Sequence, residues 1–361
     1  MRINLGKLKV YYKRYEGVLI PLALFFGFAT DILTFRLIEF TTSMLFLLGH
    51  LFFAGINIVA INYFKDNLPE MKVTSFWKLF APLFVQFSFG NLFSGFLIFY
   101  SRSGSIFASW PFLLVVAGLL IGNEIARRYD VGPVVQMGAY FFALFAYFNL
   151  ALPYIFTRLD LLMFLISGFL SLLLIAVFIH LLSGWIESVR KEKRALKITI
   201  GIVFLVMNFL YFTNLIPPIP LTLKEVDVYH HIERVNNDYI VITEECDGII
   251  GCRFSRTRRH IFQEREPIYL YSAIYAPAGM TMGITHKWQV YDENEGSWVT
   301  EAEIPFDIIG GREMGFRGYS YYTAYPGYGR VSIQTERGQT IGRKSCYLIR
   351  EEGPERTIKK R

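Results

Sequence analysis

Long apolar runs bounded by charged residues are the feature that most restricts what this chain can fold into. A bilayer core about 30 Å thick requires roughly 20 apolar residues per helix. Seven runs of about this length occur, near residues 17–35, 40–63, 79–100, 106–123, 134–156, 161–182 and 198–216. Positions 17–216 hold only 22 charged residues, whereas positions 217–361 hold 39. The sequence therefore predicts an α-helical membrane bundle of about seven transmembrane helices, followed by a domain that folds in water.

The Lys and Arg residues are divided unevenly between the two predicted membrane surfaces. Fifteen fall on one side, in residues 1–16 and in the loops 64–78, 127–128 and 183–197. The other side has only Arg36, Arg102 and Arg158. Because positive loops stay in the cytoplasm, we expect a multi-pass protein of the cell membrane with a cytoplasmic N-terminus and an extracytoplasmic C-terminal domain. No small-residue cleavage pattern follows the first run, which favours a retained helix over a removed signal peptide.

The chain beyond the last apolar run has the pattern of a β-domain. Prolines at 217, 218 and 220 end the helix and predict a stiff hinge over 217–225. β-Branched and aromatic runs then recur near 226–235, 238–244, 267–276, 281–291, 297–306, 315–324, 328–335 and 339–350. We expect an antiparallel, all-β, sandwich-like domain over 226–350 and a charged, frayed tail over 351–361. The alternation of Tyr269, Tyr271 and Ala273 indicates a strand with one wet face.

All three cysteines lie in this C-terminal region. Cys246 and Cys252 enclose five residues, so they form either a disulfide in an oxidising compartment or two unpaired thiols. Their spacing is not that of a zinc knuckle, and no second pair follows. His230 and His231 are adjacent on a predicted strand and would point to opposite faces. We therefore expect no metal site and no cofactor.

Several segments resemble a known family. The stretches HKWQVYD (286–292), SWV (297–299) and GRVSIQTERGQTIGR (329–343) resemble the C-terminal domain of a bacterial multi-pass membrane-protein family, domain-of-unknown-function family 2914. The stretches YSRSGSIFASWPF (100–112), GNE (122–124) and NLIPPIPLTLKE (214–225) are similar to sequences that accompany that domain. The resemblance implies the architecture described above. It implies no catalytic residues, because the activity of the family is unassigned.

One candidate binding site lies on the predicted outer surface. Ser101, Arg102, Ser103 and Ser105 directly precede an outward-pointing helix N-terminus, whose free N–H groups and dipole attract anions. An anionic lipid headgroup would suit this site. The alternative is that a serine caps the helix while Arg102 extends towards water.

A second candidate lies within the bilayer. His50, Asn91 and Asn208 fall at comparable depth in three predicted spans, and polar groups at such depth are costly and often functional. They would form a polar track through the bundle. Hydrogen bonding between helices explains the same residues without any function.

The β-domain offers a third candidate, an aromatic surface. Trp288, Trp298, Tyr321 and Tyr325 belong to a group of residues whose composition is typical of a surface that binds an envelope glycan or a protein partner. About half of such residues are normally core. Five arginines between 253 and 265 make a basic segment that would face anionic headgroups or acidic polymers, although a solvated loop is the commoner outcome. The net charge is +8 over residues 1–216 and −1 over the rest, so nucleic acid is not an expected partner.

Motifs for chemistry are missing from the sequence. It contains no nucleotide-binding glycine loop, no GxSxG and no HExxH. The sequence leaves open whether the protein is an enzyme and favours a non-catalytic role. The leading hypothesis is a polytopic envelope binding or scaffold protein that presents its β-sandwich outside the cell. One alternative is a membrane-embedded enzyme that acts on a lipid-linked substrate at the outer leaflet, and another is a transporter or flippase.

Overall fold

The structure of the protein is a computed structural model, which describes residues 31, 40–67, 72–126, 131–236, 238–244, 257–262, 266–323, 326–350 and 356–360. The chain forms two compact units. The first comprises residues 1–99, 111–151 and 161–209, and the second comprises residues 100–110, 152–160 and 210–361. Short segments at the ends of the helices therefore belong to the same unit as the β-domain.

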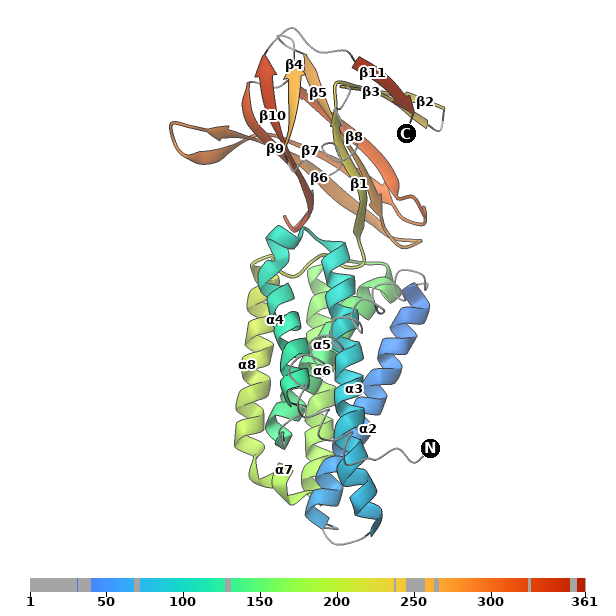
Figure 1. Ribbon diagram of the computed structural model, residues 1–361, viewed down its shortest axis with the longest axis vertical. Coiled ribbons are helices and arrows are strands. Elements are labelled where there is room, and N and C mark those ends of the chain that lie inside the picture. The colour runs from blue at the N-terminus through green and yellow to red at the C-terminus, as the bar shows by residue number, and fades with distance from the viewer. Residues whose placement is uncertain are drawn as a thin grey trace, which may run out of the picture. The chain divides into compact units, whose positions relative to one another are not determined.

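The helices of the described chain follow the apolar runs closely (Figure 1). They are α2 (Phe40–Asn67), α3 (Lys72–Ser103), α4 (Ile106–Ala126), α5 (Pro133–Phe156), α6 (Leu161–Trp185), α7 (Glu187–Lys191) and α8 (Lys193–Phe212). All of these except the short α7 are long and apolar enough to cross a membrane, which makes six candidate spans among the described residues. The second to seventh predicted spans are confirmed as helices. The first, near 17–35, lies outside the described residues except for Asp31.

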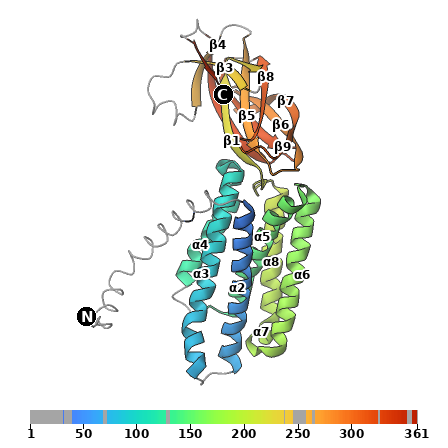
Figure 2. The ribbon, with the colours of Figure 1, turned by 90° about the vertical axis from the view of Figure 1, so that its right-hand side faces the viewer.

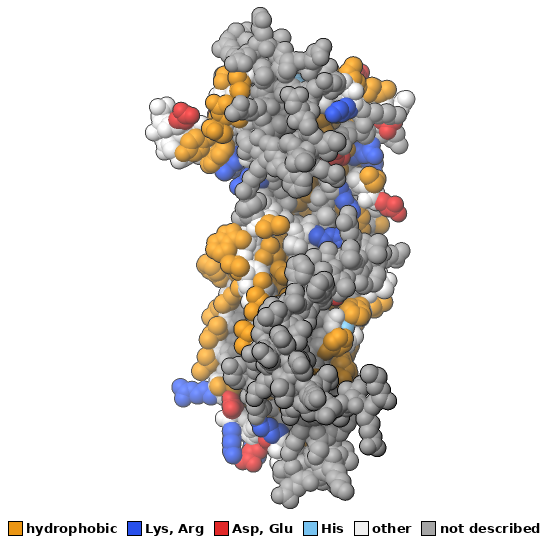
Figure 3. Space-filling view, in the orientation of Figure 1, with side chains coloured by type: hydrophobic (Ala, Val, Ile, Leu, Met, Phe, Trp, Pro, Cys, Tyr) orange, Lys and Arg blue, Asp and Glu red, His pale blue; other side chains and the backbone are white. Residues whose placement is uncertain are grey.

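Helix α5 is the most enclosed of the six long helices. The buried share of its most apolar stretch is 72%, against 28% for α4 and for α8. Phe145 of α5 packs against Phe164 of α6 and Phe204 of α8, with ring centroids 5.3 and 6.0 Å apart. In Figure 3 apolar side chains cover much of the outer surface of the helices, and Lys and Arg gather at the end that holds α7. An apolar outer surface is what a bundle in lipid requires.

The β-domain contains eleven strands among the described residues. They are β1 (Thr222–Tyr229), β2 (His231–Val235), β3 (Asp238–Glu244), β4 (Thr257–Phe262), β5 (Pro267–Tyr275), β6 (Thr281–Asp292), β7 (Ser297–Ile309), β8 (Phe316–Thr323), β9 (Gly327–Thr335), β10 (Thr340–Arg350) and β11 (Arg356–Lys360). They form a three-stranded sheet β1-β5-β8, a five-stranded sheet β4-β10-β9-β6-β7 and a small sheet β11-β3-β2. The expected all-β, sandwich-like domain is confirmed.

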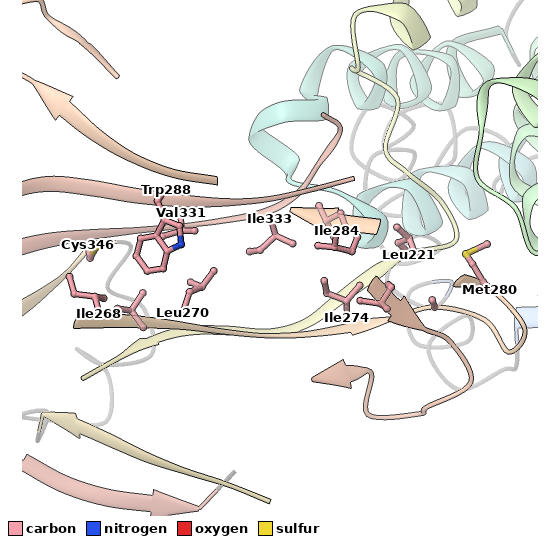
Figure 4. Packing of buried hydrophobic residues seen from close by; sticks show 14 of the residues in the cluster. Leu221, Ile268, Leu270, Ile274, Met280, Ile284, Trp288, Val331, Ile333 and Cys346 are labelled. Atoms are coloured by element: carbon pink, nitrogen blue, oxygen red, sulfur yellow. The ribbon is translucent and has the colours of Figure 1, made fainter. Parts of the chain in front are cut away.

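The main core lies between the five-stranded sheet and the β1-β5-β8 sheet. Figure 4 shows Trp288, Val331 and Ile333 of the first sheet facing Ile268 and Leu270 of the second. All of these side chains are buried, because alternate residues of each strand point inward.

Strand β5, the central strand of the sheet β1-β5-β8, is buried on both faces, contrary to the expected wet face. Tyr271 and Ala273 of β5 pack in a second cluster with Tyr239 of β3 and are only 2% and 3% exposed. The alternation of β5 is real, but a third layer covers the face that we expected to meet water.

Three further expectations for the strands are wrong. The predicted run 226–235 is two strands, β1 and β2, which belong to different sheets. The basic segment expected to be a loop contains β4, which pairs in parallel with β10, so the domain is not wholly antiparallel. The tail expected to be frayed contains β11, which pairs with β3.

Candidate functional site

The face of the five-stranded sheet that points away from the main core carries an ordered set of polar and aromatic side chains. We call this surface the outer face and define it by nine residues. They are Lys287, Gln289, Tyr291, Trp298, Tyr328, Arg330, Ser332, Arg343 and Tyr347, which alternate with the core residues of β6, β7, β9 and β10. Backbone register aligns them in rows across the strands, with Gln289 paired to Arg330 and Tyr347 paired to Tyr328.

An arginine stacked on a tryptophan lies at the centre of the outer face. The guanidinium carbon of Arg330 is 4.0 Å from the ring centroid of Trp298. Arg330 Nε donates to Gln289 Oε1 at 2.8 Å, and Gln289 Nε2 donates to Thr300 Oγ1 at 3.2 Å. The hydrogen bond fixes the plane of the guanidinium, so its remaining donors are held in place before any ligand binds.

The pKa of Arg330 falls to about 10, first because burial removes water from the guanidinium and then because Arg343 lies nearby. The side chain remains charged at neutral pH. Both causes disfavour a cation, and an anion bound at this place would offset both. The electrostatics of the outer face therefore favour a negatively charged ligand.

Aromatic rings flank this arginine. Tyr328 and Tyr347 have ring centroids 4.5 Å apart, and Tyr291 meets Trp298 edge to face at 5.3 Å. Tyr328 is 49% exposed. The four rings lie on four adjacent strands, so the row extends for about 14 Å at the usual spacing between strands. The row offers an extended, partly apolar surface.

A second row of the outer face carries charge. Arg343 Nε donates to Ser332 Oγ at 3.1 Å, and Lys287 forms an ion pair with Glu303 at 2.7 Å. Only the lysine has an acidic partner among the described contacts of this row. The charge of the outer face is therefore positive.

Trp288 is not part of any surface, and the expectation that it contacts a partner is wrong. It is only 5% exposed and donates through Nε1 to Ser320 Oγ at 3.2 Å. The same Ser320 Oγ lies 2.8 Å from His286 Nδ1, and Ser272 Oγ lies 2.9 Å from His286 Nε2. Burial lowers the pKa of His286 to about 3, so the ring is neutral. This closed network gives the core specificity and offers no group to a substrate.

Tyr321 lies on a different sheet from the outer face. It is 60% exposed and packs with Tyr269 at 5.4 Å between ring centroids. Burial and the neighbouring tyrosines raise the pKa of Tyr269. Tyr325 lies outside the described residues. The expected aromatic surface is thus divided, and of its three described residues only Trp298 belongs to the outer face.

The serines expected to bind an anion lie close to the β-domain within one compact unit. Ser103 is 4% exposed, and the backbone N–H of Ser105 donates to Thr340 O at 3.2 Å. Ser105 O accepts from the N–H groups of Ala108 and Ser109, which begins α4. Ser101 is half-buried and Arg102 is exposed. Anion binding by these four residues stays a prediction, with one amide of the site already paired.

The three polar residues expected within the membrane do not hydrogen-bond to one another in the part of the chain that the structure describes. Asn91 Nδ2 donates to Phe87 O and Asn208 Nδ2 donates to Phe204 O, each one turn earlier on its own helix. His50 stacks edge to face on Phe46, with centroids 4.5 Å apart. The carboxylate of Asp31 accepts from Ser94 Oγ of α3 at 2.5 Å. A polar track through these residues stays a prediction.

The cysteines and the potential metal-ligating side chains of the described residues form no further binding site. Cys246 and Cys252 lie outside the described residues, so their disulfide stays a prediction. Cys346 is a buried free thiol whose pKa rises to about 12, mainly through burial. Among the residues that the structure describes, no group of three His, Cys, Asp or Glu side chains could hold a metal ion.

Sequence reasoning missed most of the outer face. Arg330, Gln289 and Tyr347 were not singled out, because each is an ordinary strand residue in isolation. The signal available in the sequence was alternation. Residues 289, 291, 328 and 330 each lie an odd number of positions from a core residue of their own strand, so they point to the opposite face. Only the pairing of β6 with β9 brings them together.

Comparisons with known proteins match one part of the chain to a family. Residues 282–345 match the family described as "Protein of unknown function (DUF2914)". This match confirms the expected resemblance and places a DUF2914 domain in the C-terminal region. It covers β6 to β9 and half of β10, and it includes most of the outer face and His286. No curated protein matches the chain.

Two solved structures match the chain weakly. A β-glucosidase from Listeria innocua in complex with gluconolactone is 10% identical with a TM-score of 0.21, and the match covers 32% of this chain and 17% of that one. The alkylpurine DNA glycosylase AlkC of Pseudomonas fluorescens, bound to DNA containing an abasic site analog, is 10% identical with a TM-score of 0.20, and the match covers 85% of this chain and 98% of that one. Likenesses this weak carry no argument about fold or function.

Proposed function

We propose that this chain, with a DUF2914 domain in its C-terminal region, is a non-catalytic protein of the cell membrane that binds an acidic glycan of the envelope. Its helices serve as the anchor, and the β-domain is on the extracytoplasmic side. The outer face of the five-stranded sheet is the binding surface. The observation that carries the proposal is Arg330, held over Trp298 and fixed by Gln289.

The chemistry of the outer face suits a sugar polymer better than a compact ligand. Sugar rings present apolar C–H faces that pack on aromatic rings such as Tyr328, which is 49% exposed. Carboxylate or phosphate groups on such a polymer would pair with Arg330 and Arg343. The surface runs across several strands, which favours an extended chain over a small molecule in a pocket.

The membrane anchor and the sidedness rest on composition. Six described helices have the length and hydropathy of membrane spans. Fifteen of the Lys and Arg residues in and before the helical region fall on one predicted side and three on the other. This distribution supports a cytoplasmic N-terminus and, with seven spans, a β-domain outside the cytoplasm.

Binding of defined polysaccharides to the purified full-length protein tests the proposal. We expect the wild-type protein to bind polygalacturonate, with an affinity that falls as salt rises, and to bind neutral dextran much more weakly. Arg330→Gln should weaken polygalacturonate binding by about tenfold, because a charged hydrogen bond is lost. Tyr328→Ala should weaken it as well.

Arg312→Gln is the matched control, because it removes the same charge from an exposed residue in the turn before β8. It should leave binding unchanged. Equal weakening by Arg312→Gln and Arg330→Gln would show that only net charge matters and would contradict a specific face. The proposal also fails if the wild-type protein binds neither polymer.

A further inference from the structure

Within the helical unit lies a cavity that the proposed function does not use. It has a volume of about 260 Å³ and is lined by residues of α2, α3, α4 and α5 together with Val131. A single water needs about 10–15 Å³, so the space is large enough for much more than water. These helices are packed together in Figures 1 and 2. Val135 lines the cavity and is 61% exposed, so the cavity reaches the surface of the helices.

The lining is apolar along most of its length. Phe89 and Phe93 of α3 contribute aromatic rings, and Gly118 and Gly122 of α4 leave open space. A Cβ atom added at either glycine would meet nothing within 4 Å. The cavity can therefore hold an apolar chain, which is the kind of molecule that the surroundings of a membrane bundle supply.

Three carboxamides stand at the cavity, and two of them are already paired. Asn123 Nδ2 donates to Gln86 O at 2.9 Å. Gln136 Nε2 donates to Val131 O at 2.8 Å, and Gln136 Oε1 accepts from Asn62 Nδ2 at 2.9 Å. Gln86 Oε1 is different, because it is buried and has no hydrogen-bond partner among the described residues.

A buried acceptor without a donor is costly, and the cost is greatest where no water is present. An occupant that brings an O–H group would satisfy it. A neutral hydroxyl suits an apolar cavity better than an ammonium group, since burying a charge without a counter-charge costs far more. Gln86 lines the same cavity as the phenylalanines and glycines, so one molecule can bring both the donor and the chain.

We propose that this cavity binds a membrane-dissolved long-chain alcohol, with the chain against Phe89 and Phe93 and the hydroxyl donating to Gln86 Oε1. The site is independent of the outer face and of glycan binding. It is formed entirely by residues of the helical unit.

Photolabelling of the full-length protein in lipid vesicles tests this proposal. The probes are a long-chain alcohol with a photoreactive group in its chain and the methyl ether of the same molecule, which has no donor. We expect the alcohol to label peptides of α3, α4 and α5 and the ether to label them about tenfold less. Gln86→Met keeps the length of the side chain but removes the acceptor, so it should reduce alcohol labelling to the level of the ether.

Gly122→Leu fills the cavity and should reduce labelling by both probes about tenfold or more. Gly49→Leu is the matched control, because a Cβ there also meets nothing within 4 Å and Gly49 does not line the cavity. It should leave labelling unchanged. The proposal is overturned if both probes label the wild type and Gln86→Met equally, which would indicate ordinary bilayer chains in the cavity. It is also overturned if Gly122→Leu, with a thermal midpoint like that of Gly49→Leu, labels as strongly as the wild type.

Discussion

At the scale of single residues, His286 shows how the core of the β-domain restricts the chemistry of a titratable side chain. The ring is fully buried, and both nitrogens lie within hydrogen-bond distance of serine hydroxyls. Histidine is a common catalytic and metal-binding residue, but a histidine buried as His286 is cannot reach a substrate. Its position on the inner side of β6 makes it a structural residue, in contrast to its neighbours Lys287 and Gln289.

We predict that the stability of the full-length protein falls as the pH drops below about 6.5. Burial lowers the pKa of His286 to about 3 in the fold from its ordinary value of 6.5, so the unfolded chain binds the proton first. The contribution of this residue is fully present above pH 6.5 and decreases by up to about 1.4 kcal/mol per pH unit towards pH 3. Thermal unfolding measured against pH should show a shallower decline for His286→Gln than for the control His231→Gln, whose histidine is exposed. Identical slopes for the two variants would contradict this assignment.

Cys346 should be inert in the native protein. Its thiol is 2% exposed, and burial raises its pKa to about 12, so almost no thiolate exists at neutral pH. In a variant with Cys246→Ser and Cys252→Ser, a maleimide reagent should label Cys346 only after denaturant is added. Rapid labelling of the folded protein would show that β10 does not bury this side chain.

At the scale of elements, strands were predictable where a run of β-branched and aromatic residues was long and bounded by turns. Strands β5, β6, β9 and β10 fall within a few residues of the expected ranges. Strand β4, TRRHIF, was missed because its arginines resemble a solvated loop, and pairing with β10 is what makes it a strand. The break at His230 was missed because nothing local ends β1. Pairing with neighbouring strands decides both cases, and the local sequence pattern gives no information about that pairing.

The turn between β7 and β8 depends on Gly315. Its φ is +87°, and a Cβ there would lie 2.9–3.1 Å from backbone atoms of Ile274 on β5. Gly315→Ala should therefore lower the free energy of unfolding by about 3 kcal/mol, from left-handed strain and the clash together. Gly327→Ala is the control, with φ +128° but nothing within 4 Å of the added Cβ, and it should cost about 1–2 kcal/mol from backbone strain alone. Denaturant unfolding measures both changes, and equal losses would exclude the clash as the cause.

At the scale of the whole molecule, apolar length and charge distribution predicted the succession of helices and β-domain. Six predicted spans coincide with described helices because the length of such a helix is set by the bilayer. The boundary between the compact units was not predictable in the same way. Residues 100–110 and 152–160 join the β-domain unit through contacts such as Ser105 N–H to Thr340 O, which are distant in sequence.

The candidate binding site was predictable only in composition. Aromatic residues in the C-terminal region indicated a binding surface, and Trp298 is part of the outer face, for which we propose glycan binding. Trp288 was assigned wrongly because the face of the sheet to which a strand residue points cannot be known before the packing of the sheet is known. The surface is made by four strands, β10, β9, β6 and β7, and the charged centre Arg330 gains its role from neighbours on the adjacent strands.

The most direct test of the whole account is the side of the membrane on which the outer face lies. Ser297→Cys places an exposed thiol at the start of β7, and Glu192→Cys places one between α7 and α8. Both are made in the chain with Cys246→Ser and Cys252→Ser, where buried Cys346 stays silent. A membrane-impermeant maleimide applied to intact cells should label Ser297→Cys at once and Glu192→Cys only after permeabilisation. The reverse pattern would place the β-domain in the cytoplasm and would contradict envelope binding.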